Sequence, residues 1–163
     1  MAAVPQSRTS ECPGTNTPNR TLLIPCGAPS TMNDAAVLIV EDETMILLDL
    51  EAGFEDAGFE VVGASNATSA TATFDANPEQ FKALVTDIRL GPGKSGWDVA
   101  RHLRQTNPAI PVVYISGDSS VQWHLEGVPN SVMITKPFIV PHIISAISML
   151  LSQLSSMDPS GQG

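Results

Sequence analysis

Short apolar runs alternate along the chain with longer segments in which apolar residues recur at helical spacing. Residues typical of turns bound each run, as expected of strands buried in a sheet. The expected strands are residues 37–40, 60–64, 83–87, 112–115 and 132–135. The expected helices are residues 44–57, 66–76, 96–106, 118–127 and 141–154. Strands and helices that alternate at this spacing predict an α/β domain with a parallel, doubly wound sheet.

Three of these helices carry specific expectations. On the first helix, apolar residues at helical spacing predict a buried face made of Met45, Leu48 and Ala52, widened by Ile46, Leu47, Leu50 and Phe54. The helix at 118–127 is expected to be short, because Gly127 and Pro129 interrupt it. The isoleucines of the last helix are expected to pack into the core, with an interface as the alternative.

The two ends of the chain differ from the middle in composition. Residues 1–33 are rich in Pro, Ser, Thr and Asn without an apolar period, so a disordered N-terminal tail is expected. We expect Met32 to be the true start of translation, with a genuine flexible arm as the competing interpretation. Residues 34–154 are expected to form the domain, and residues 155–163 a disordered C-terminal tail.

Charge and composition exclude several classes of protein. The chain of 163 residues carries a net charge of −9, and residues 34–154 hold fifteen of its seventeen acids and six of its eight bases. This balance argues against a nucleic-acid-binding surface, which needs clustered Lys and Arg. Cys12 and Cys26 lie outside the predicted domain and provide neither a disulfide framework nor a metal site. No signal peptide or membrane span is expected, which favours the cytoplasm.

Polar side chains follow four of the expected strands at the point where each strand ends. They are Glu41 and Asp42, Asp87, Ser116 and Lys136. Carboxyl ends of parallel strands share one edge of the sheet, where ligand sites form in open α/β folds. Each residue alone has an ordinary structural explanation, and the prediction of a site rests on their convergence.

The convergent groups predict phosphoryl chemistry. Three carboxylates about 4 Å apart repel by about 4 kcal/mol for each pair at an effective dielectric near 20, which a cation relieves. Oxygen ligands alone favour Mg²⁺. Asp carboxylates act as nucleophiles toward phosphoryl groups, whose oxygens Lys136 and Ser116 could then neutralise. The sequence contains no G-x-G-x-x-G and no P-loop motif, so no nucleotide fold is predicted.

Residues 36–154 resemble a response-regulator receiver domain. The matching segments are Val-Glu-Asp-Glu at 40–43, Val-Thr-Asp-Ile-Arg-Leu at 85–90, Gly96, Tyr-Ile-Ser-Gly at 114–117 and Thr-Lys-Pro-Phe at 135–138. The resemblance implies a flavodoxin-like sheet of five strands in the order 2-1-3-4-5, with helices on both faces. It also implies a cis peptide bond between Lys136 and Pro137.

The resemblance assigns a role to each site residue. Asp87 would accept a phosphoryl group from a histidine kinase or a histidine phosphotransfer protein. The implied Mg²⁺ ligands are Glu41, Asp42, Asp87 and the backbone carbonyl of Arg89. Lys136 and Ser116 would hold the phosphoryl oxygens.

Three positions modulate this expectation. Arg89 and Asp118 lie two residues beyond Asp87 and Ser116, where the family tunes the lifetime of the phosphoryl group. We expect the two side chains to pair across the mouth of the site and restrict water, with two unpaired surface charges as the alternative. The third is Met133, which stands where the family usually has an aromatic switch residue.

The sequence therefore predicts a single-domain response regulator that passes its signal to an unnamed downstream protein. Only nine residues follow Leu154, so no output domain is expected. Nucleic-acid and membrane partners are not expected, and a homodimer is left open. The alternatives are a receiver-like interaction module that signals without phosphorylation and, more remotely, an Asp-nucleophile Mg²⁺ phosphatase. The protein is not expected to be an enzyme beyond accepting and losing the phosphoryl group.

Overall fold

The computed structural model describes residues 35–118 and 121–157. The predicted N-terminal tail, its alternative start at Met32 and residues 158–163 lie outside the described residues, as do residues 119–120. The strands are β1 (Ala36–Val40), β2 (Glu60–Ala64), β3 (Phe81–Asp87), β4 (Val112–Ser116) and β5 (Ser131–Thr135). The helices are α1 (Thr44–Asp56), α2 (Ala67–Ala76), η2 (Pro78–Gln80), α3 (Gly96–Thr106), α4 (Val121–Glu126) and α5 (Val140–Met157).

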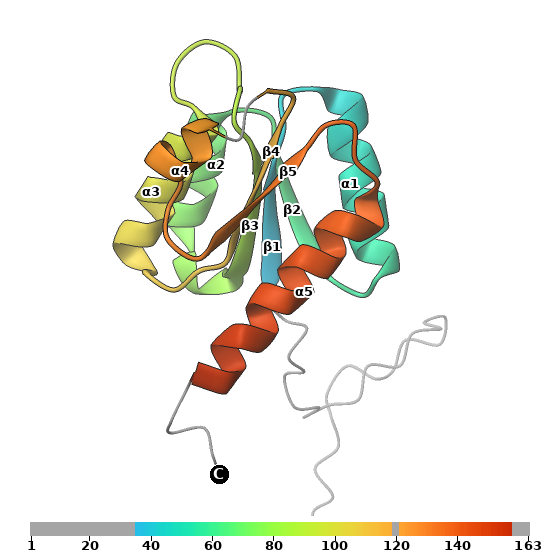
Figure 1. Ribbon diagram of the computed structural model, residues 1–163, viewed down its shortest axis with the longest axis vertical. Helices are drawn as coiled ribbons and strands as arrows, with labels where there is room; N and C mark the ends of the chain where they lie inside the picture. The colour runs from blue at the N-terminus through green and yellow to red at the C-terminus, as the bar shows by residue number, and fades with distance from the viewer. Residues whose placement is uncertain (1–34, 119–120, 158–163) are drawn as a thin grey trace, which may run out of the picture. The chain divides into compact units, whose positions relative to one another are not determined.

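The five strands form one parallel sheet in the order β2-β1-β3-β4-β5, which confirms the predicted fold class. Figure 1 shows the carboxyl ends of the strands together at one edge of this sheet. Asp87 on β3 is in register with Ile115 on β4, and Ser116 with Thr135 on β5. The register therefore places the ends of three neighbouring strands at the same level.

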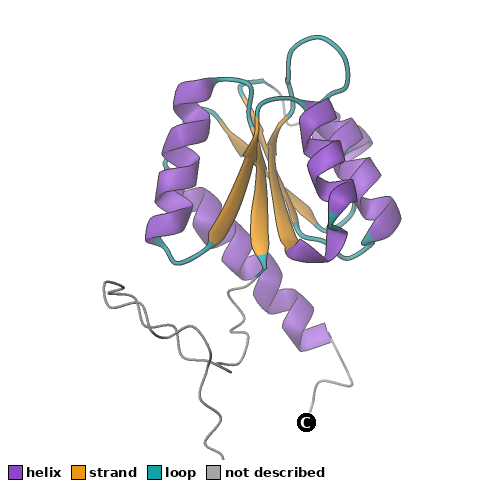
Figure 2. Cartoon of the chain, turned by 180° about the vertical axis from the view of Figure 1, so that it is seen from behind, coloured by secondary structure: helices purple, strands orange, loops and turns teal. Residues whose placement is uncertain are grey.

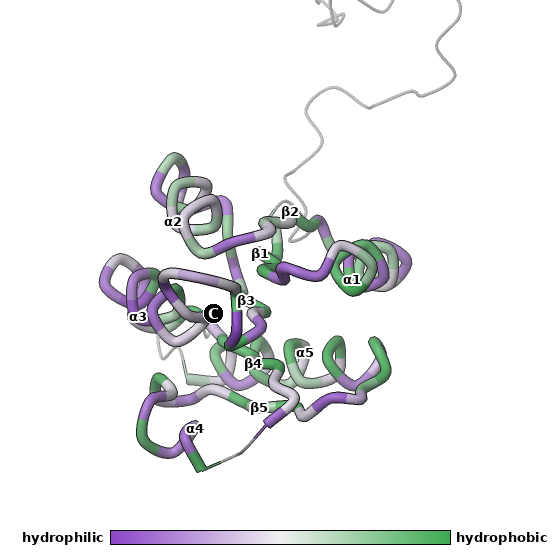
Figure 3. The backbone as a smooth tube through the Cα atoms, turned by 90° about the horizontal axis from the view of Figure 1, so that it is seen from above, coloured by the Kyte–Doolittle hydropathy of each residue, from purple (hydrophilic) through white to green (hydrophobic). Residues whose placement is uncertain are grey.

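Helices cover both faces of the sheet, as Figures 2 and 3 show. α1 and α5 pack on one face around Leu50, Phe54, Ile143 and Ile147, all fully buried. α2 and α3 pack on the other face, where their buried apolar residues join those of the strands. Each aliphatic or aromatic side chain taken out of water in this way contributes about 1.5–3 kcal/mol to folding. The central strands β1, β3 and β4 are thus buried on both sides, which explains their continuous apolar sequences, whereas the edge strands β2 and β5 are only partly buried.

The predicted buried face of α1 is wrong in part. Met45 and Leu48 are 77% and 54% exposed, and the residues buried on this helix are Leu50 and Phe54. Leu50 and Phe54 pack into the core shared with the strands and α5. A Cβ at Gly53 would overlap a methyl group of Val140, so this glycine lets α1 and α5 approach closely while Met45 and Leu48 face solvent.

Helix α5 is longer than predicted and extends through Met157, so the first three residues of the expected C-terminal tail are helical. Its length and composition would allow it to cross a membrane. Ile143, Ile147 and Leu150 are nevertheless buried on it, which makes α5 part of the domain core. This confirms that its isoleucines serve core packing. α4 is short, as expected, with six residues and none of them buried.

Candidate functional site

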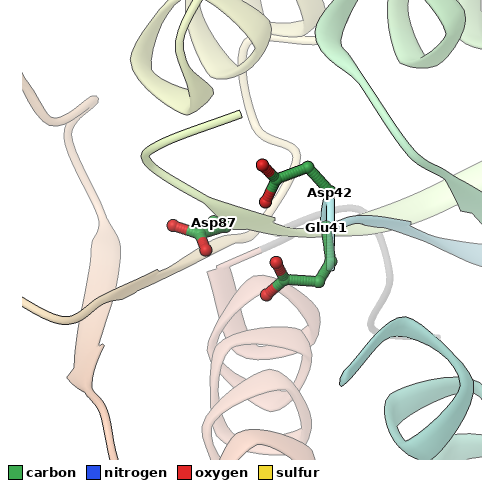
Figure 4. A group of neighbouring side chains, drawn as sticks. All are labelled: Glu41, Asp42 and Asp87. Carbon is green, nitrogen blue, oxygen red and sulfur yellow. The ribbon is translucent and has the colours of Figure 1, made fainter. Parts of the chain in front are cut away.

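Three carboxylates meet at the carboxyl edge of the sheet. Glu41 and Asp42 directly follow β1, and Asp87 ends the neighbouring strand β3. One oxygen atom from each side chain lies within 4.8 Å of the other two. Figure 4 shows the side chain of Asp87 beside those of Glu41 and Asp42. The strand ends thus converge as the sequence predicts.

Lys136 adds a positive charge to this cluster from the end of β5. Its Nζ donates a hydrogen bond to Oδ2 of Asp87 at 2.7 Å and lies 3.4 Å from Oε2 of Glu41. Burial acts to lower the pKa of the Lys136 ammonium group, but the hydrogen bond and charge of Asp87, followed by Glu41, raise it further than burial lowers it. Lys136 is therefore held as a cation. The peptide bond between Lys136 and Pro137 is cis, as the resemblance implied.

Glu41 is the most buried member of the cluster, with no exposed surface. Its Oε1 accepts a hydrogen bond from the amide of Glu43, whereas the buried Oε2 accepts no hydrogen bond from the described residues and has only the 3.4 Å ion pair with Lys136. Burial raises the pKa of Glu41 to about 7, and the charge of Asp87 adds to this effect. A divalent cation among the three carboxylates would coordinate Oε2, which accepts no hydrogen bond from the described residues, so the residues present fit such an ion.

Asp87 is fixed in place from its own loop. Its Oδ1 accepts a hydrogen bond from the amide of Arg89 at 2.9 Å, and the amide of Gly96 donates to the carbonyl of Ile88 at 2.9 Å. A Cβ at Gly96 would overlap the backbone carbonyl oxygen of Asp87, so only glycine lets α3 begin this close to β3. The acidic side chain is thus held at the floor of the site, with 5% of the residue exposed.

Ser116 reaches the same edge but is engaged elsewhere. Its hydroxyl donates to the backbone carbonyl of Asp118 at 2.7 Å and accepts from the amide of Asp118 at 3.1 Å. The single hydroxyl proton therefore serves the loop after β4. To contact a group bound at Asp87, Ser116 must first give up the carbonyl of Asp118.

Arg89 and Asp118 form an ion pair across the mouth of the site, with Nη2 of Arg89 3.4 Å from Oδ2 of Asp118. Both side chains are largely exposed, at 80% and 69%, so solvent screens the pair and it contributes little to stability. The geometry matches the expected pairing. Any effect of the pair on water access stays a prediction.

Met133 lies opposite Tyr114 in the β4–β5 ladder, below the site. It is half-buried and packs against the core cluster on the face covered by α2 and α3, as does Trp123 of α4. The indole of Trp123 donates to the hydroxyl of Ser131 at 3.0 Å. α4 and Met133 thus pack against the same core cluster, and the indole of Trp123 ties α4 to the start of β5.

The charged groups line an open cleft of about 600 Å³. The site residues in its wall are Glu41, Asp42, Asp87, Arg89, Asp118 and Lys136. Glu43 and Gly117 also line the cleft, although the sequence had given neither a role. Glu43 directly follows Asp42, and Gly117 directly follows Ser116. Their positions next to predicted site residues could have identified them from the sequence. The cleft can admit a small anion together with a cation.

Residues 37–148 match the family described as the response regulator receiver domain. The chain is 30% identical over 115 residues to the phyllosphere-induced regulator PhyR of Methylorubrum extorquens, covering 71% of this chain and 43% of that protein. It is 33% identical over 125 residues to the transcriptional regulatory protein YkoG of Bacillus subtilis, covering 75% and 53%. The chain thus spans about half the length of the curated relatives it matches.

A solved structure agrees with these matches. The response regulator receiver protein of Sinorhizobium medicae superposes with a TM-score of 0.71 at 37% identity, over 75% of this chain and 98% of that one. The match over residues 37–148 includes the three acids, Ser116 and Lys136. We conclude that this chain belongs to the response-regulator receiver family of two-component signalling.

Proposed function

We propose that Asp87 is the phosphoacceptor of a Mg²⁺-dependent signalling switch. The observation that carries this proposal is the position of its carboxylate, which lies between the Lys136 ammonium group and the acid pair Glu41 and Asp42 at the floor of an open cleft. The incoming phosphoryl oxygens need positive charge beside the nucleophilic carboxylate, which Lys136 supplies directly and the acid pair would supply by holding Mg²⁺.

The chemistry follows from the positions of these groups. A carboxylate oxygen of Asp87 forms a bond to phosphorus as the bond from phosphorus to the donor breaks, and the donor group leaves with its electron pair. Lys136 stays beside the transferred group, because its Nζ already contacts Oδ2 of Asp87. Mg²⁺, held by Glu41, Asp42, Asp87 and the backbone carbonyl of Arg89, would neutralise charge on the phosphoryl oxygens.

Ser116 links phosphorylation to a change in conformation. Its hydroxyl proton is donated to Asp118 in the unphosphorylated protein. A phosphoryl oxygen at Asp87 is a stronger acceptor than a peptide carbonyl, because it carries charge. When Ser116 donates to it, Asp118 loses one of the two hydrogen bonds that fix the start of the β4–α4 connection.

The partners follow from the same proposal. A histidine kinase or a histidine phosphotransfer protein supplies the phosphoryl group, and the region around α4 and β5 passes the signal to a downstream protein or to a second copy. The net charge of −9 makes nucleic acid an unfavourable partner for this domain. We propose the cytoplasm as its location and self-dephosphorylation as its only turnover.

The test is the intact mass of the protein after incubation with acetyl phosphate. Wild type with Mg²⁺ should gain one phosphoryl group, whereas wild type with a chelator and Asp87→Asn should gain none. Asp56→Asn, which changes an exposed acid at the end of α1, is the matched control and should behave as wild type.

An adduct on Asp87→Asn would contradict the proposal. If wild type gains no phosphoryl group from acetyl phosphate or from a phosphorylated histidine protein, the phosphorylation-independent interaction module becomes the better account. The observation that favours this module is Met133, which stands where the family usually has an aromatic switch residue.

A further inference from the structure

A second concave site lies at the opposite end of the sheet from Asp87. It is a groove of about 390 Å³ between the α3–β4 loop and the last turns of α5. Figure 1 shows α5 extending past the end of the sheet at which the strands begin. The volume is within the range of about 300–1,000 Å³ typical of small-molecule sites.

The walls of the groove are apolar. Pro108 and Pro111 contribute one side, and Leu150, Leu154 and Met157 contribute the other. Along α5, Ile143, Ile147, Leu150, Leu154 and Met157 follow one another at intervals of four and three residues, so they form one stripe. The first three are buried in the core, whereas Met157 is 73% exposed. The stripe that packs on the sheet thus continues beyond it as a wall of the groove.

Arg104 is the one cationic residue that lines this groove. It is half-buried on α3, and its Nε donates to the carbonyl of Ile110 at 2.9 Å, which fixes the guanidinium group. Arg89 and Arg101 each pair with a carboxylate, but no carboxylate of the described residues pairs with Arg104. Burial lowers its pKa, as expected for a cation removed from water without a counter-ion.

We propose that this groove binds a small monocarboxylate with an apolar body, whose carboxylate pairs with Arg104 while its hydrocarbon part contacts Leu154 and Met157. A guanidinium group presents two parallel N–H donors that match the geometry of a carboxylate. The domain carries a charge of −9, so a guanidinium group without a carboxylate partner in an apolar groove favours a ligand that is anionic and has an apolar part to bury.

The probe is octanoate, titrated into the full-length protein and followed by amide and Arg104 side-chain NMR signals. Saturable shifts are expected at Ala109, Gln153 and Arg104 Nε, with a dissociation constant in the millimolar range or tighter. Acetate, which lacks the apolar body, and octanol, which lacks the charge, should each bind at least about tenfold more weakly.

Matched variants separate the groove from other charge effects. Arg104→Gln should weaken octanoate binding by about tenfold or more, and Arg101→Gln on the preceding turn of α3 should change it less than twofold. Arg104→Lys keeps the charge and should retain part of the affinity for octanoate. It provides the test of Arg104 if Arg104→Gln does not fold. Asp87→Asn should bind as wild type, so the proposal stands apart from phosphorylation.

Several results would overturn the proposal. They are the absence of saturable shifts in wild type, equal binding by Arg104→Gln, and equal binding of octanol and octanoate. A change in oligomeric state on Arg104→Gln would also overturn it, since the groove would then hold a second copy of the chain.

Discussion

The connections that follow β3 and β4 lie side by side at the edge of the site, yet they are built very differently. After β3, the amide of Arg89 holds Asp87, the amide of Gly96 holds Ile88, and Ser95 and Asp98 form a capping box at the start of α3. After β4, the described attachments are the two hydrogen bonds between Ser116 and Asp118 and one exposed ion pair.

The helices beyond these connections differ in the same way. α3 has five buried residues in eleven, whereas α4 has none in six. α4 is attached near its carboxyl end, where Arg101 pairs with Glu126 and the amide of Val128 donates to the hydroxyl of Tyr114 at 3.2 Å. Asp87, the proposed phosphoacceptor, therefore lies on a connection with many attachments, while the neighbouring connection has few and is the one expected to change conformation.

The largest expected effect comes from glycines in the two connections. Gly96→Ala places a Cβ against the carbonyl oxygen of Asp87, which is backbone and cannot move aside, so the free energy of unfolding should fall by about 3 kcal/mol. Gly117→Ala meets nothing within 4 Å and should change it by less than about 0.5 kcal/mol. Chemical denaturation measures both, and equal losses would remove the contrast.

A smaller effect is expected from the buried charge beside the rigid connection. The pKa of Glu41 is about 7 in the folded protein against an ordinary value of 4.5, so the group stabilises the fold below pH 4.5 and this contribution is lost as pH rises through 7. Above pH 7 and without divalent cations, Glu41→Gln should therefore be more stable than wild type, by up to about 3 kcal/mol and typically less.

The same variant should bind Mg²⁺ at least about tenfold more weakly, because it loses an anionic oxygen ligand. Denaturation at several pH values, with and without Mg²⁺, measures both properties. Stability curves for Glu41→Gln and wild type that stay parallel across this pH range would show that Glu41 is not buried as a charged group.

The capping box should contribute about 1 kcal/mol. Ser95 accepts from the amide of Asp98, and Asp98 accepts from the amide and hydroxyl of Ser95, so Ser95→Ala should lower the free energy of unfolding by this amount. Asn66→Ala, which removes the cap of α2, is the control. It should lower the free energy of unfolding by about the same amount as Ser95→Ala and leave Mg²⁺ binding at Asp87 unchanged.

Acid titration sharpens this prediction. The hydrogen bonds from Ser95 lower the pKa of Asp98, so its contribution is present above the ordinary value of 3.8 and is lost as pH falls through the lowered pKa. Asp98→Asn should flatten the acid limb of the stability curve. An unchanged acid limb would mean that the box does not hold α3 in solution.

The smallest effect on stability is expected for the ion pair that bridges the two connections. Arg89→Ala and Asp118→Ala should each change the free energy of unfolding by less than about 0.5 kcal/mol. Each should speed self-dephosphorylation by less than about tenfold, because water reaches Asp87 more easily. Lys94→Ala removes an exposed cation from the same β3–α3 connection and should leave the rate unchanged. An unchanged rate in Arg89→Ala would contradict the role of the pair.

Sequence patterns predicted the features that depend on local order. Apolar runs that end in Glu41, Asp87, Ser116 and Lys136 sufficed to predict a parallel sheet and the meeting of these residues at one edge. The alternation of strands and helices fixes which strand ends converge, so the site could be predicted without knowledge of any contact.

Features set by contacts between distant segments could not be predicted in this way. α1 carries apolar residues around most of its circumference, and its packing against the sheet and α5 leaves Met45 and Leu48 facing solvent. The hydroxyl of Ser116 donates to the carbonyl of Asp118, and this bond depends on the path of the loop after β4. The groove that holds Arg104 joins α3 to the end of α5, segments more than forty residues apart in the sequence.

The most direct test of the account identifies the residue that carries the phosphoryl group. Wild type is treated with acetyl phosphate and Mg²⁺, reduced with borohydride, which converts an aspartyl phosphate to homoserine, and digested for peptide mass analysis. The account predicts homoserine at position 87 alone, and none when a chelator is present. Homoserine at Asp42 instead, or the same yield at Asp87 without a divalent cation, would contradict it.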